Sequence, residues 1–145
     1  MTVLVEIVNE ASDEVVDGLN RFLPQLSSTA TEVTLSQLRD MVLSSSTTLF
    51  VARNNGALVG TLTLAAFRIP TGLRGWIEDV VVDESARGTG VGEALTLAAI
   101  DEARRRGIRS LDLTTRPTRD AANRLYARLG FERRETNVYR FSLES

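Results

Sequence analysis

Six consecutive residues near the middle of the chain have the types and spacing of an anion-binding loop. They are Arg87, Gly88, Thr89, Gly90, Val91 and Gly92. A run of apolar β-formers ends just before them at Asp83, and an alanine- and leucine-rich segment with helical spacing follows. Glycines let a backbone approach an anion closely, and the first N–H groups of a helix are free to bind it. The order strand, glycine turn, helix therefore predicts a site for a phosphorylated cofactor.

Two common phosphate-binding loops do not fit these residues. The P-loop ends in Gly-Lys-Ser/Thr, and this chain contains no lysine. The dinucleotide fingerprint is Gly-x-Gly-x-x-Gly, and Glu93 stands where its third glycine would be. A nucleotide-binding fold is therefore disfavoured, and the pattern that remains is Arg-x-x-Gly-x-Gly.

A second motif, Leu-Tyr-Ala-Arg-Leu-Gly-Phe-Glu, runs from Leu125 to Glu132. With the glycine loop and its preceding strand, it resembles the signatures of the GNAT N-acetyltransferase superfamily. The resemblance implies that N–H groups of the loop hold the pyrophosphate of acetyl-CoA. It also implies that backbone groups near Val80 and Val82 pair with the pantetheine arm, while the side chains of the strand end pack in the core. That strand end comprises Val80, Val81 and Val82.

Glu78 and Asp79 are adjacent carboxylates in this otherwise apolar strand. Neighbouring strand residues point to opposite faces, so the two cannot share one role. If Val80 and Val82 face the core, Glu78 faces it too, and desolvation would raise its pKa towards that of a useful base. The resemblance implies a catalytic acidic residue on this strand. Glu78 is the first candidate for the base and Asp79 the second, with structural or substrate-binding roles as the alternative.

Tyr126 lies where the family's Leu-Tyr pair places a general acid, which would protonate the departing thiolate of coenzyme A. The alternative is a core tyrosine on an apolar helix face. Many family members have a cofactor-binding asparagine seven residues before the tyrosine, and Arg119 stands there in this chain. Asn123, one turn later, is the candidate to replace it, against the alternative of a solvated helix face.

The composition restricts the chemistry further. The chain has no cysteine and no histidine, so acid–base catalysis would use Asp, Glu, Tyr, water or backbone groups. We expect no metal site, no thiol nucleophile and no Ser–His–Asp mechanism. A net charge of −2 argues against a nucleic-acid partner, and no apolar run is long enough to span a membrane. The first ten residues lack the features of a signal peptide, so we expect a cytoplasmic protein.

The 145 residues are predicted to form a single domain, residues 1–145, of α/β class around a central mixed sheet. The resemblance implies the GNAT arrangement, whose central strands splay apart to admit the cofactor arm. Helices are predicted at 12–23, 34–42, 91–106 and 118–129. Strands are predicted at 3–8, 47–53, 57–67, 76–83 and 108–114, with one or two more within 131–143. Loops are expected at 24–31 and 68–74.

These residues favour an acetyl-CoA-dependent N-acyltransferase in which a primary amine of a small molecule or peptide attacks the thioester directly. The alternative is an acyl-CoA-binding sensor or scaffold without turnover. The sequence does not identify the amine, although the acidic pair hints at a cationic one. A homodimer is an expectation from the family.

Overall fold

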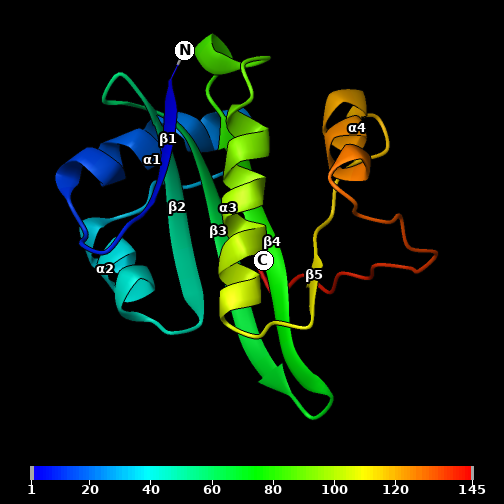
Figure 1. Cartoon of the computed structure of the whole chain (residues 1–145). Helices are drawn as coiled ribbons and strands as arrows, with labels where there is room; N and C mark the ends of the chain where they lie inside the picture. Colours follow the sequence, from blue (N-terminus) through cyan, green and yellow to red (C-terminus); the bar gives the residue numbers. More distant parts are fainter. Residues whose placement is uncertain (1, 145) are drawn as a thin grey trace. The chain divides into compact units, whose positions relative to one another are not determined.

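The computed structural model describes residues 2–144 in two compact parts, one ending at Leu113 and the other beginning at Thr114. The first part contains a five-stranded sheet in which neighbours in sequence are neighbours in space (Figure 1). The strands are β1 (Val3–Ile7), β2 (Thr47–Asn54), β3 (Ala57–Ile69), β4 (Gly72–Val82) and β5 (Ser110–Asp112). The first four pair antiparallel and β5 pairs parallel to β4, so the predicted mixed sheet is confirmed.

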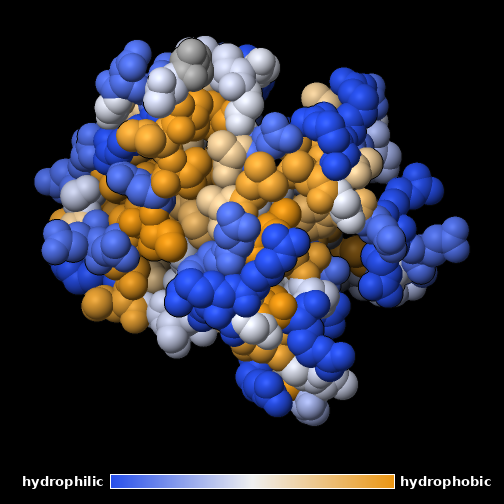
Figure 2. Space-filling model, viewed as in Figure 1, coloured by the Kyte–Doolittle hydropathy of each residue, from blue (hydrophilic) through white to orange (hydrophobic). Residues whose placement is uncertain are grey.

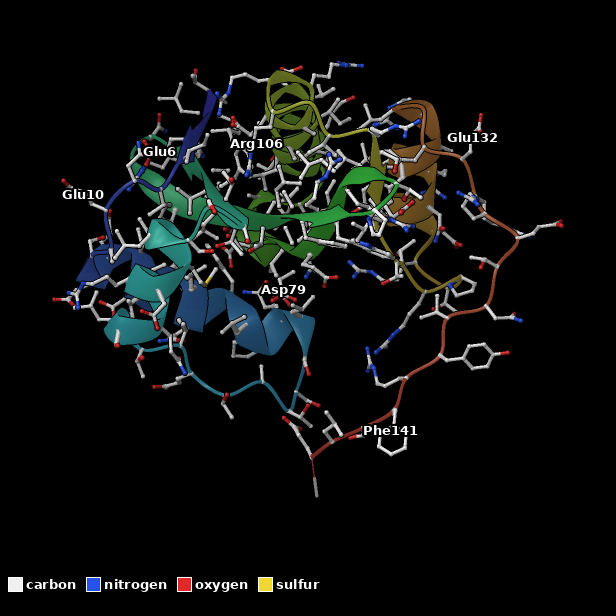
Figure 3. The ribbon with its side chains drawn as sticks, turned by 90° about the horizontal axis from the view of Figure 1, so that it is seen from below. Glu6, Glu10, Asp79, Arg106, Glu132 and Phe141 are labelled. Carbon is white, nitrogen blue, oxygen red and sulfur yellow. The ribbon has the colours of Figure 1, made fainter. Side chains whose placement is uncertain are left out.

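Helices cover both faces of this sheet. α1 (Asp13–Leu26) and α2 (Leu35–Leu43) lie on one face, and α3 (Val91–Arg105) lies on the other (Figure 3). On the first face Phe22 of α1 packs with Val51 and Val81, both from strands. Burial on two faces explains why the central strands are nearly continuous apolar runs rather than alternating ones.

The sequence predicted the starts of the first two helices correctly. Ser12 accepts a hydrogen bond from the N–H of Val15 at 3.3 Å. Thr34 and Gln37 form a reciprocal capping box at the start of α2. These side chains replace the backbone partners that the first turn of a helix lacks.

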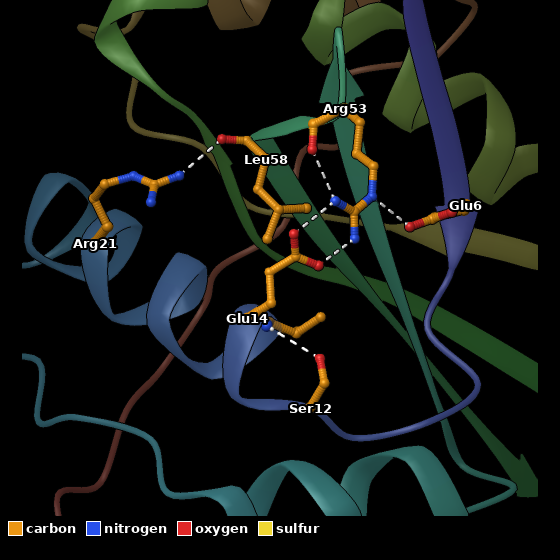
Figure 4. Close-up of polar contacts among 8 residues, drawn as sticks. Glu6, Ser12, Glu14, Arg21, Arg53 and Leu58 are labelled. Atoms are coloured by element: carbon orange, nitrogen blue, oxygen red, sulfur yellow. Dashed lines mark hydrogen bonds and ion pairs between the residues drawn. The ribbon is translucent and has the colours of Figure 1, made fainter.

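Arg53 joins three elements of the first part (Figure 4). Its Nε donates to Glu6 of β1 at 2.7 Å, and its two terminal nitrogens donate to Glu14 of α1 at 2.7 and 3.1 Å. It also donates to the carbonyl of Gly56 in the turn between β2 and β3. Asn55 and Gly56 have φ values of 52° and 83°, as the Asn-Gly hairpin signal predicted.

Two predicted loops are partly wrong. α1 continues through Pro24 to Leu26, so the expected loop at 24–31 begins later. The expected loop at 68–74 is mostly strand, because β3 and β4 form one long hairpin that turns between Ile69 and Gly72. Gly72 has a φ of 143° and lies against the side chain of Arg109. Pairing between two long strands outweighed the local turn signals of Pro70 and Gly72.

The second part contains α4 (Asp120–Arg128), and no residue of this helix is buried. The N-cap is Arg119 rather than the predicted Thr118. Residues 131–144 contain no strand, contrary to the prediction. Tyr139, Phe141 and Leu143 do alternate, but all three are almost fully exposed. An alternating pattern forms a strand only when a neighbouring strand supplies its hydrogen bonds.

The described helices include none that is long and apolar enough to cross a membrane. Figure 2 shows apolar side chains gathered over β1 and α3, two elements that carry the exposed residues Leu4, Ile7 and Leu97. β1 is the edge strand of the described sheet, so one side of it has no strand neighbour there.

Candidate functional site

The glycine loop follows β4 through a short 3₁₀ turn, Glu84–Ala86, and leads directly into α3. Gly88 and Gly90 have φ values of 76° and 89°, and a Cβ at either position would meet no atom within 4 Å. Gly90 is the N-cap of α3, and in the described part of the chain no side-chain hydrogen bond caps this helix at its N-cap. The start of α3 therefore presents an open, glycine-bordered helix N-terminus, which is the geometry that binds a phosphate group.

Hydrogen bonds within the loop hold its shape. The hydroxyl of Thr89 donates to the carbonyl of Ala86. The Nε of Arg87 donates to the carbonyl of Val82 at 3.4 Å. The hydroxyl of Thr96, one turn into α3, donates to the carbonyl of Gly92 at 2.7 Å. The loop is thus ordered by two of its own side chains and by one from α3.

Beside the loop, the edge of β4 is open on the β5 side. β5 pairs only with Arg74–Trp76 of β4, near the start of that strand. Further along, Asp83 directs its N–H to Val59 of β3 at 2.8 Å. Because main-chain groups alternate in direction along a strand, those of Val82 point away from β3. Among the described strands none pairs with β4 beyond Trp76 on this side, as the predicted divergence of the central strands requires, so the end of β4 next to the glycine loop has no strand neighbour there.

A β-bulge interrupts β4 at the two carboxylates. Thr61 of β3 pairs with Val81, but Thr63 pairs with Glu78, so β4 contains one extra residue between these pairs. Asp79 lies in the bulge with a φ of 50°, in the left-handed region. A bulge shifts the alternation of side chains by one position. Val81 and Glu78 consequently face the same side of the sheet, the side that carries α1.

The bulge corrects the sequence-based argument about burial. The valine that is fully packed is Val81, with 5% of its surface exposed, whereas Val80 and Val82 are half-buried. Glu78 and Asp79 are both exposed, so Glu78 does not lie buried in the core as the sequence argument expected. Figure 3 shows Asp79 on the α1 side of the sheet. The structure thus offers two solvent-accessible carboxylates beside the unpaired edge, and their roles remain predictions.

In the second part of the chain, Tyr126 of α4 is half-buried and contacts Phe131 edge-to-face, with ring centroids 5.6 Å apart. Burial raises the pKa of its phenol, and the positive charge of Arg119 partly offsets this. The phenol therefore stays protonated at neutral pH and is able to donate a proton.

Asn123 has a structural task in the same part. Its side-chain amide donates to the carbonyls of Arg116 and Arg119, at 3.0 and 2.8 Å, and so closes the turn that begins α4. Whether Asn123 or Arg119 contacts the cofactor stays a prediction. Within the described residues no group of three or more acidic, histidine or cysteine side chains could hold a metal ion.

The comparisons with known proteins agree with this geometry. The model of the acetyltransferase (GNAT) family matches residues 13–131, so the chain belongs to that family. The crystal structure of an acetyltransferase from Trypanosoma brucei superposes with a TM-score of 0.77 at 25% identity, covering 98% of this chain and all of that one.

Two curated relatives are similar over shorter stretches. Mycothiol acetyltransferase of Thermobispora bispora is 40% identical over 92 residues, which are 61% of this chain and 31% of that protein. N-alpha-acetyltransferase 30 of Schizosaccharomyces pombe is 34% identical over 95 residues, which are 65% of this chain and 63% of that protein. The chain therefore matches less than two thirds of either relative. The predicted membership of the GNAT acetyltransferase family is confirmed.

Proposed function

We propose that this protein transfers the acetyl group of acetyl-CoA to a primary amine. The observation that carries the proposal is the open N-terminus of α3, bordered by Gly88 and Gly90, next to the end of β4 that has no neighbouring strand on the β5 side among the described residues. The N-terminus of α3 would hold the pyrophosphate through N–H groups of residues 87–92. The end of β4 would offer main-chain groups of Val80 and Val82 to the pantetheine amides, as a neighbouring strand would.

The proposed reaction is a direct attack. The amine gives a proton to a carboxylate, either directly or through water, and its nitrogen then bonds to the thioester carbonyl carbon. A backbone N–H of β4 polarises the carbonyl oxygen. The carbon–sulfur bond breaks, and the phenol of Tyr126 protonates the departing thiolate.

Glu78 is the proposed base and Asp79 the alternative. Both carboxylates are exposed at the bulge, so an amine or a bridging water can reach either. Two accessible negative charges also favour an acceptor that is cationic before it loses its proton. The acceptor class is accordingly proposed as a cationic primary amine, on a small molecule or a peptide. A cytoplasmic location and a homodimer stay predictions.

A second candidate function is an acyl-CoA-binding module without turnover, because Glu78, the proposed base, is exposed rather than buried in the core. A single assay distinguishes the two. Release of coenzyme A is measured against a panel of primary amines that spans cationic and neutral compounds, small molecules and peptide N-termini. Turnover with any amine supports the enzyme, whereas tight acetyl-CoA binding without turnover on the whole panel supports the binding module.

Cofactor choice is tested separately by thermal melts. Acetyl-CoA at a hundred times its Kd should stabilise the fold by about 2.7 kcal/mol through mass action. NAD and ATP at the same concentration should shift the melting temperature much less. Equal shifts from NAD would refute the coenzyme A assignment.

The role of Glu78 is tested with Glu78→Gln, with Asp79→Asn as the matched variant. If Glu78 is the base, kcat falls at neutral pH and partly recovers as the pH rises, because more of the amine is already unprotonated. If Glu78 only binds a cationic amine, the loss appears in KM. A loss of kcat with Asp79→Asn alone would move the base to Asp79.

A further inference from the structure

Asp83, the residue at which the chain leaves β4, is held by side chains on both sides. Its Oδ1 accepts a hydrogen bond from Nε2 of Gln25 at 3.0 Å, and its Oδ2 accepts one from the hydroxyl of Ser85. Gln25 belongs to the last turn of α1, whereas Ser85 belongs to the 3₁₀ turn that leads into the glycine loop. One carboxylate therefore connects a distant helix with the start of the loop.

The backbone continues this connection into the loop. The N–H of Asp83 donates to Val59 at 2.8 Å, and its carbonyl accepts from the N–H of Ala86 at 2.9 Å. The carbonyl of Ala86 in turn accepts from the hydroxyl of Thr89, immediately before Gly90. These hydrogen bonds thus connect α1 through Asp83 with Thr89, the residue before the N-cap of α3.

Several features show that this connection is anchored rather than incidental. Arg21, one turn before Gln25, donates to the carbonyl of Leu58 at 2.8 Å and so fixes this end of α1 on the start of β3. The hydrogen bonds from Ser85 and Gln25 lower the pKa of Asp83, which keeps its carboxylate ionised and a strong acceptor. Phe22 of the same helix is fully buried against Val81 of β4.

We propose that Gln25 and Ser85 are positioning residues for acetyl-CoA: through Asp83 they hold the glycine loop in the conformation that receives the pyrophosphate. The inference rests on the proposed function, because it assigns the loop to coenzyme A. A loop held in its binding conformation avoids the entropy cost of ordering when the ligand arrives. Loss of the connection therefore weakens acetyl-CoA binding and leaves the chemical step alone.

The first test is Gln25→Leu, which keeps the bulk of the side chain and removes the donor. Gln37→Leu is the control, since it breaks the capping box of α2 without touching Asp83. Losing a hydrogen bond to a charged group should weaken coenzyme A binding about tenfold, measured by calorimetry. KM for acetyl-CoA should rise similarly with kcat unchanged. A Gln25→Leu protein with wild-type affinity, or an equal loss in Gln37→Leu, would overturn the proposal.

A double-mutant cycle tests whether the effect passes through Asp83. Asp83→Ala should weaken coenzyme A binding at least as much as Gln25→Leu, and adding Gln25→Leu to Asp83→Ala should change little more. Ser85→Ala, at an exposed position, provides a second single variant should Asp83→Ala fold poorly. Additive losses from Gln25→Leu and Asp83→Ala would mean that Gln25 acts by another route and would refute the proposal.

Hydrogen exchange of the unliganded protein separates this inference from the proposed function. Gln25→Leu should speed exchange at the bonded amides of Ala86 and Arg87, and Gln37→Leu should not. Unchanged exchange would overturn the positioning role even if the protein binds coenzyme A. Failure of the wild-type protein to bind coenzyme A would instead refute the proposed function.

Discussion

The part of the chain ending at Leu113 and the part beginning at Thr114 hold their functional residues in different ways. In the first, the glycine loop is built from main-chain geometry and follows a strand whose core side chains are buried on both faces. In the second, α4 has no buried residue, and Tyr126 is half-buried with its ring against Phe131. The proposed cofactor site therefore depends on main-chain conformation, whereas the proposed proton donor is a single side chain on a helix without buried residues.

This difference has a general consequence. Substitutions in the first part should act on cofactor affinity and on folding together, because the same strands supply the core and the site. Substitutions in the second part should change catalysis with little effect on stability. The four predictions below test that contrast, from the largest expected effect to the smallest.

Gly90→Glu is expected to have the largest effect. It places a carboxylate at the N-terminus of α3, where it repels the pyrophosphate and blocks its approach. Loss of two charge-assisted hydrogen bonds would cost about 3–6 kcal/mol, or about 10²–10⁴-fold in affinity for acetyl-CoA. Calorimetry measures the affinity, and circular dichroism checks that the domain is folded.

Gly107→Glu is the matched control for that variant. Gly107 also has a positive φ, 74°, and open space around its Cα, but it follows the other end of α3. The substitution Gly107→Glu adds the same charge and the same backbone strain as Gly90→Glu. Equal losses of affinity in the two variants would show that strain, rather than the loop, is responsible.

Tyr126→Phe tests the second part. The ring and its contact with Phe131 survive, but the proton donor is lost, so kcat should fall by about 10²–10⁴-fold with little change in acetyl-CoA binding. Tyr139→Phe is the control, because Tyr139 is the other tyrosine and is 88% exposed. An unchanged kcat in Tyr126→Phe, when chemistry limits the rate, would leave water as the proton donor.

A pair of leucine variants tests the contrast in stability. Leu62 is fully buried at the centre of the sheet, so Leu62→Ala should lower the free energy of unfolding by about 2–5 kcal/mol. Leu125→Ala, in α4, removes a half-buried side chain and should cost clearly less. Denaturant unfolding measures both. Equal costs would contradict the contrast and show that α4 contributes to stability as much as the sheet does.

The smallest effect is expected at the ion pair between Glu14 and Arg53. Hydrogen bonding to Arg53 lowers the pKa of Glu14 below its ordinary value of 4.5. The pair therefore stabilises the fold above that pH, and the contribution is lost as the pH falls through the lowered pKa. Glu14→Gln should reduce the acid-side loss of stability slightly, as measured by thermal melts between neutral and acidic pH. In an Arg53→Met background Glu14→Gln should have no further effect.

The strand–turn–helix geometry of the candidate site was predicted from the sequence because its signals are local. The glycine turn before α3 was predicted correctly, since the positive φ values of Gly88 and Gly90 and an uncapped helix start favour glycine at fixed spacings, whereas its role in binding stays a prediction. Helix caps at Ser12 and Thr34 were predicted for the same reason. The bulge at Asp79 was not, because an extra residue in a strand is defined only by the register of its neighbour, β3.

The sequence by itself determined the class of the protein: the order of strands and helices, the glycine loop and the absence of cysteine and histidine chemistry. Only the tertiary structure decided which valine of β4 packs in the core, that Glu78 is exposed, and that Gln25 reaches Asp83 from 58 residues away. The physical reason is the separation along the sequence of the residues that interact. Capping, turns and periodicity are fixed by residues a few positions apart, whereas register, burial and contacts between elements are set by residues that meet only when the chain folds.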